Sequence, residues 1–199
     1  MSNYSNYFQA GLSYPVYKQL IVDLLAAQKT TGQDHSEFML HYSKMNLQRM
    51  NRVEKTTELL PELSTYLKSF NKPLNFLVIT EGWCGDAAQI VPVIQKMVEV
   101  NPQLFNLRCV LRDENLELID AHLTNGGRAI PVLLLLDEEG DLIGEKWGPR
   151  PAILQDLLNT WKTEGVVMPE LAEKIHAWYA KDKTVATQQS LLNHMQKVI

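Results

Sequence analysis

The chain has 199 residues, of which 45% are hydrophobic and 21% are charged, which is ordinary for a soluble globular protein. Lysines and arginines number 19 against 23 acidic residues, and the resulting formal charge of −4 gives no electrostatic reason to expect a nucleic-acid partner. No signal peptide is readable at the start, and the longest apolar run, Ala129 to Leu136, is far too short for a membrane span.

The number and spacing of the cysteines and histidines indicate which kinds of site the chain can hold. Two cysteines, Cys84 and Cys109, are too few for a disulfide framework, so we expect a cytoplasmic protein whose thiols stay reduced. The five histidines are scattered, and none stands at metal-ligand spacing from a cysteine or from another histidine. The sequence therefore predicts no metal site and no cofactor.

The first seventy residues have helical patterns. Ser13 followed by Pro15 is typical of a helix start, and apolar residues from Tyr17 to Leu25 then recur at helical spacing. Further helices are indicated after 34–36 and around Pro61. We expect a helical N-terminal extension over residues 1–72.

From residue 73 the pattern changes to alternating strands and helices. Short apolar runs predict strands over 74–80, 107–111 and 130–136, helical repeats cover 86–100, 115–123 and the segment from 153, and a hairpin turn leads into 142–146. This order predicts parallel pairing of the strands, with the hairpin as an antiparallel edge. We expect an α/β domain over 73–163 and a C-terminal helical extension over 164–199, packed as one compact unit.

Cys84 occupies a reactive position in this scheme. It comes directly after a buried strand and directly before a helix, whose free N–H groups favour thiolate over thiol and so lower the cysteine pKa. Trp83 is expected to shelter one side of the sulfur, and Gly85 allows the sharp turn. Cys84 is therefore the candidate catalytic residue.

Four features in register give the segment from about 74 to 163 a resemblance to the thioredoxin family. These are Trp83-Cys84-Gly85, Pro92 inside the following helix, Ile130-Pro131 before a leucine-rich strand, and Gly148 after the hairpin. The resemblance implies a central mixed sheet flanked by helices, a cis bond before Pro131, and a substrate site formed by Trp83, Gly85, Asp86, Ile130 and Pro131.

The chain also departs from the family pattern. Ala87 replaces the resolving cysteine, so it cannot release a mixed disulfide. Asp86 places a negative charge beside the thiol, and Val78 stands where thioredoxins bury a proton-relaying carboxylate. Cys109 lies in mid-strand, where we interpret it as a core residue out of reach of Cys84.

Three arginines are further candidates. Arg128 matches an arginine that thioredoxins place near the active site, the alternative being a solvated loop charge. Arg49 and Arg52 lie in a segment similar to the helical extension of a bacterial thioredoxin-like subfamily with Trp-Cys-Gly-Asp loops. We consider that they fold over the loop and offset Asp86, or that they form a solvated helix face.

Two functions from different classes follow from this pattern. The first is a monothiol redox protein, in which Cys84 forms a mixed disulfide or a sulfenic acid and an external thiol completes the cycle. Its partner would be a protein disulfide or thiol, or a small-molecule thiol. The second is a non-catalytic peptide- or protein-binding module built on the same fold. Nucleic acid and membrane are not expected as partners, and the oligomeric state stays open.

Overall fold

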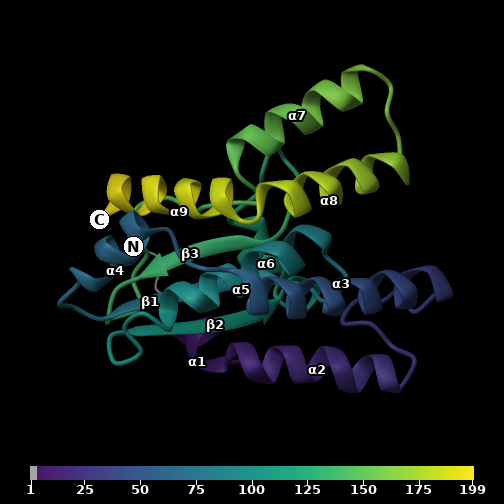
Figure 1. Ribbon diagram of the computed structural model, residues 1–199. Helices are drawn as coiled ribbons and strands as arrows, with labels where there is room; N and C mark the ends of the chain where they lie inside the picture. The colour runs from purple at the N-terminus through teal and green to yellow at the C-terminus, as the bar shows by residue number, and fades with distance from the viewer. Residues whose placement is uncertain (1–3) are drawn as a thin grey trace.

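A three-stranded mixed sheet lies in the middle of the molecule (Figure 1). The structure, a computed structural model, describes residues 4–199, so the first three residues of the predicted N-terminal extension lie outside it. The strands are β1 (Leu74–Thr80), β2 (Phe105–Leu111) and β3 (Val132–Leu136), in the order β2-β1-β3. The predicted fold class, a thioredoxin-like mixed sheet flanked by helices, is confirmed.

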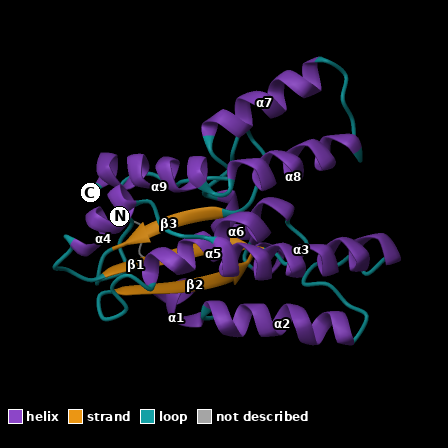
Figure 2. Cartoon of the chain, viewed as in Figure 1, coloured by secondary structure: helices purple, strands orange, loops and turns teal. Residues whose placement is uncertain are grey.

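Helices precede, link and follow the strands (Figure 2). The N-terminal segment forms α1 (Ser5–Ala10), α2 (Tyr14–Ala26), α3 (Glu37–Thr56) and α4 (Pro61–Lys68). Between the strands lie α5 (Gly85–Val98), the 3-10 turn Arg112–Glu114 and α6 (Leu116–Asp120). The chain ends with α7 (Ala152–Thr163), α8 (Glu170–Asp182) and α9 (Val185–Val198). Within residues 4–199, no helix combines the length and the apolar character needed to span a membrane.

The direction of β3 corrects the sequence-based topology. β1 pairs with β2 in parallel, as predicted, but β3 runs antiparallel to β1. The reason is the five-residue helix α6. At 1.5 Å per residue it is only about 7 Å long, whereas β2 is about 23 Å long, so α6 cannot carry the chain back to the starting end of the sheet. The expected edge strand at 142–146 is reduced to two isolated bridges, Leu136 with Leu142 and Leu133 with Trp147.

The core explains why β1 is almost entirely apolar. Six of its seven residues are buried, since the strand is central in the sheet and covered on both faces. One hydrophobic cluster joins β1 to side chains from both helical ends of the chain, such as Tyr17 and Leu191. Cys109 belongs to this core: it is fully buried opposite Val78, and its backbone also pairs with Leu12. The core position predicted for Cys109 is confirmed.

Candidate functional site

Cys84 is the N-cap residue of α5, at the point where the chain leaves β1. Its Sγ accepts a hydrogen bond from the N–H of Ala87 at 3.4 Å. The thiol donates to the carbonyl oxygen of Ile130 at 3.3 Å, and the Ile130–Pro131 peptide bond is cis. The strand-to-helix junction and the cis bond expected from the family resemblance are therefore present. Both cysteines are free thiols.

The environment of the thiol shifts its pKa in the direction opposite to the one expected. Cys84 is only 8% exposed. Burial raises its pKa to about 12, and the negative charge of Asp86 adds to the rise, against the lowering effect of the helix N–H groups and of Arg150. The prediction of a lowered pKa is wrong because desolvation outweighs the helix N-terminus. The thiol is protonated at neutral pH.

Two side chains from the two helical extensions cover the loop at Gly85. Tyr42 from α3 and His176 from α8 are hydrogen-bonded to each other, with Oη and Nε2 2.9 Å apart. Both lie against Gly85: a Cβ added there would stand 2.5 Å from Tyr42 Oη and 2.7 Å from His176 Cε1. Gly85 is therefore required by this close approach. We call Tyr42 and His176 the cover pair.

The cover pair is the end of a chain of hydrogen bonds that starts at Arg52. The guanidinium donates to Gln89 Oε1 at 3.0 Å, so the amide nitrogen of Gln89 faces His176 Nδ1 at 3.5 Å and donates to it. His176 then carries its proton on Nε2 and donates to Tyr42. Burial, with the nearby charges of Arg49 and Arg52, lowers the His176 pKa to about 4, so the ring is neutral at pH 7.

Asp86 is neutralised by a residue that the sequence analysis did not identify. Arg150 contacts both carboxylate oxygens, at 2.5 Å and 3.3 Å, and Tyr179 from α8 donates to Oδ1 at 2.7 Å. The carboxylate and guanidinium side chains are 11% and 14% exposed. This desolvated ion pair lies directly beside the thiol.

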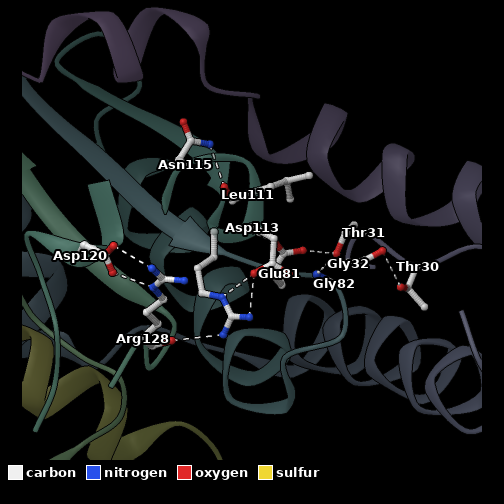
Figure 3. A network of polar contacts seen from close by, with 11 residues as sticks. Thr30, Thr31, Gly32, Glu81, Gly82, Leu111, Asp113, Asn115, Asp120 and Arg128 are labelled. Atoms are coloured by element: carbon white, nitrogen blue, oxygen red, sulfur yellow. Dashed lines mark hydrogen bonds and ion pairs between the residues drawn. The ribbon is translucent and has the colours of Figure 1, made fainter. Parts of the chain in front are cut away.

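The predicted arginines serve other contacts. Arg49 donates to Asn46 at 2.7 Å and lies over the Tyr42 ring, and Arg52 binds Gln89, so neither is the partner of Asp86. The prediction that Arg49 and Arg52 offset the charge of Asp86 is therefore wrong as to the partner, which is Arg150. Both arginines do lie on α3, which packs against α5. Arg128 directs its guanidinium at Asp120, with contacts of 2.6 Å and 2.7 Å (Figure 3).

Trp83 is packed by the N-terminal extension and by an arginine after β2. Its indole lies against Gly32, where an added Cβ would stand 2.5 Å from Nε1. The guanidinium of Arg112 lies over the ring, 4.6 Å from its centroid. Ile130 and Pro131 are buried as well. A peptide site on these residues stays a prediction, because Trp83 packs against Gly32 and Arg112.

Glu81, three residues before the thiol, is a fully buried carboxyl group. It accepts hydrogen bonds from the Thr31 hydroxyl and from the backbone N–H of Asp113, the latter at 3.0 Å, while Thr31 also accepts from Gly82 N–H (Figure 3). Burial raises the Glu81 pKa from 4.5 to about 7 against these bonds. Glu81 thus ties the loop between β1 and α5 to the N-terminal extension through a group whose pKa is about 7.

Glu81→Gln is expected to remove a pH dependence of stability. Below pH 4.5 the carboxyl is protonated in the folded and unfolded chains, and above about pH 7 it is ionised in both. Between these values only the unfolded chain has released the proton, so the free energy of unfolding falls as the pH rises, by about 3 kcal/mol in total. The variant lacks this fall. Urea unfolding at four pH values from 4.5 to 7.5 measures it, with exposed Glu62→Gln as the control. Parallel profiles for Glu81→Gln and the wild type would contradict the assignment.

Sequence reasoning missed Glu81, Asn46, Gln89, Arg150 and His176. Asn46 and Gln89 carried a signal that could have found them. Each is a polar residue at a position whose helical spacing places it on a buried face, Asn46 with Ser43, Met50 and Val53, and Gln89 within the apolar run of α5. Asn46 donates to the Gly82 carbonyl at 3.1 Å and so orients the loop.

The described part of the chain holds no group of three or more histidine, cysteine or acidic side chains arranged for a metal ion. The groups present at the site are one protonated thiol, a desolvated ion pair and a set of hydrogen-bonded polar side chains. Ala87 is buried at the position of a resolving cysteine.

Comparisons with known proteins agree with this geometry. A family model described as thioredoxin matches residues 32–162, about two thirds of the chain. A protein of unknown function from Pseudomonas aeruginosa has a similar structure, with a TM-score of 0.62 and 19% identity over 96% of both chains. An HIV epitope-scaffold crystal structure matches with a TM-score of 0.56 and 19% identity over 78% of this chain and 82% of that one. A search of curated proteins finds no match.

Proposed function

The chain belongs to the thioredoxin family, and we propose that it acts as a non-catalytic, protein-binding member of that family rather than as a turnover oxidoreductase. The observation that carries this proposal is the state of Cys84. Its thiol is covered, donates to the Ile130 carbonyl and has a pKa of about 12, and Ala87 supplies no second sulfur. A buried, protonated thiol without a resolving partner is typical of a structural cysteine.

Alkylation of Cys84 by iodoacetamide tests the proposal, with the modified peptide identified by mass spectrometry. We expect slow modification whose rate shows no titration midpoint below pH 8.5, since burial disfavours the thiolate. In about 8 M urea the chain is unfolded and Cys84 is exposed. Its alkylation rate should then depend on pH as that of a free cysteine does, with a pKa of about 8.5. A midpoint below 8.5 in the folded protein would contradict a non-catalytic role.

Binding is tested separately by affinity capture with the wild type and with Cys84→Ser. A binding module retains the same partners in both proteins, with and without dithiothreitol, because its contacts do not include a covalent sulfur bond. Partners that disappear with the variant or with the reductant would overturn the proposal. Acceleration of insulin disulfide reduction by dithiothreitol would do so as well.

Monothiol redox activity is the second candidate, favoured by the hydrogen bond from Ala87 N–H to Sγ. In that case the Cys84 thiolate attacks a disulfide, forms one new S–S bond and releases one thiolate, which takes up a proton. An external thiol then attacks the mixed disulfide, regenerates Cys84 and leaves as a new disulfide. This cycle requires the thiol to lose both its cover and its proton. Nonreducing gels of the captured complexes would show the mixed disulfide directly.

A further inference from the structure

A cavity of about 370 Å³ lies between α3, α5 and the junction of α8 with α9. Its polar lining includes Arg52, Gln89, Tyr179, Lys183 and Thr184. Figure 1 shows α8 and α9 following each other along one side of the molecule, and Lys183 and Thr184 form the break between them. The volume is in the range of cavities that hold small ligands.

The charge on this cavity is of one sign. Among the described residues that line it, Arg52 and Lys183 are the two cations and none is a carboxylate. Within residues 4–199 neither cation forms an ion pair. Because the whole chain carries a net charge of −4, two cations without an acidic partner on one cavity are an uncompensated local excess. Such a cavity attracts an anion.

The donors suit an oxyanion with more than one charged oxygen. Arg52 uses its Nη2 on Gln89, and its remaining N–H groups have no acceptor within the described chain. A guanidinium binds phosphate or carboxylate oxygens in a fork, and an ammonium adds a point charge. Thr184 Oγ1 accepts from Gln188 Nε2 at 3.0 Å, so its own O–H stays available as a donor. Three donors thus line the same space.

We propose that this cavity binds a small molecule that carries two negative charges on oxygen atoms, the property shared by phosphate esters and dicarboxylates. The inference goes beyond the binding role proposed above and does not depend on the Cys84 thiol. The ligand would nevertheless touch two residues of the candidate site. Gln89 contacts His176 of the cover pair, and Tyr179 donates to Asp86.

Isothermal titration calorimetry of the full chain at low salt tests the site, with inorganic phosphate and succinate as probes. We expect at least one probe to bind, and Arg52→Gln or Lys183→Gln each to weaken that probe about tenfold, the value of one charge-assisted hydrogen bond. Lys55→Gln is the matched control, since Lys55 is exposed on α3 outside the cavity lining. The Lys55→Gln variant should bind the probe with the same affinity as the wild type.

Each result of the titrations identifies a ligand class or contradicts the proposal. Binding of phosphate alone assigns the site to phosphate esters, and binding of succinate alone assigns it to dicarboxylates. No heat from either probe, or equal weakening by all three substitutions, would overturn the proposal. Circular dichroism verifies the fold of each variant, and if Arg52→Gln unfolds the chain, Lys183→Gln decides, because it changes only an exposed side chain.

Discussion

Arg150→Met is expected to lower the free energy of unfolding by about 3 kcal/mol at pH 7, the cost of leaving one member of a buried ion pair without its partner. Asp86 would keep the Tyr179 hydroxyl but lose both contacts to the guanidinium. Its carboxylate side chain is 11% exposed, so water cannot replace the lost charge. Urea unfolding followed by circular dichroism measures the loss.

Arg128→Met is the matched control for this variant. Arg128 also binds one aspartate through two contacts, but its side chain and that of Asp120 are each 45% exposed. Because water and salt screen such an exposed pair, Arg128→Met should lower the free energy of unfolding far less than Arg150→Met does. In the double variant Asp86→Asn with Arg150→Met, the buried charge is gone and part of the stability should return. Equal losses for Arg150→Met and Arg128→Met would show that burial does not set the strength of the Asp86–Arg150 pair.

Gly148→Ala is expected to cost about 3 kcal/mol or more, because two effects add. Gly148 has φ of +118°, a conformation essentially restricted to glycine. An added Cβ would also lie 2.3 Å from the carbonyl oxygen of Pro131, a backbone atom that cannot rotate away. The backbone at Pro131 or at position 148 would have to shift to relieve this contact.

Gly126→Ala separates the two effects. Gly126 also has positive φ, +76°, but an added Cβ meets no atom within 4 Å. This variant pays only the conformational cost of about 1 kcal/mol. Thermal or urea unfolding of the two variants should therefore differ by about 2 kcal/mol. The same loss in both would mean that the contact with Pro131 contributes nothing.

Local patterns predicted most of the scaffold, although not the direction of β3. A buried central strand needs a mostly apolar run, and Leu74 to Thr80 supplies one, with Asn75 and Thr80 as its two polar residues. Ser13 and Ser36 stand at the N-caps of α2 and α3, close to the starts predicted from capping residues and proline. Trp83-Cys84-Gly85 and Ile130-Pro131 placed the thiol at the start of α5 and opposite the cis bond. The strand and the helix starts depend on neighbours in sequence, whereas the cis bond that faces the thiol from 46 positions away was implied by the family resemblance.

What the sequence by itself determined is thus the thioredoxin-like frame, the single cysteine at its strand-to-helix junction and the missing second thiol. Only the tertiary structure decided the state of that thiol. Arg150 pairs with Asp86 across 64 positions and His176 meets Tyr42 across 134, and no local pattern encodes such meetings. Desolvation depends on which side chains pack over a group, so the Cys84 pKa follows from the folded extensions rather than from its place on the helix.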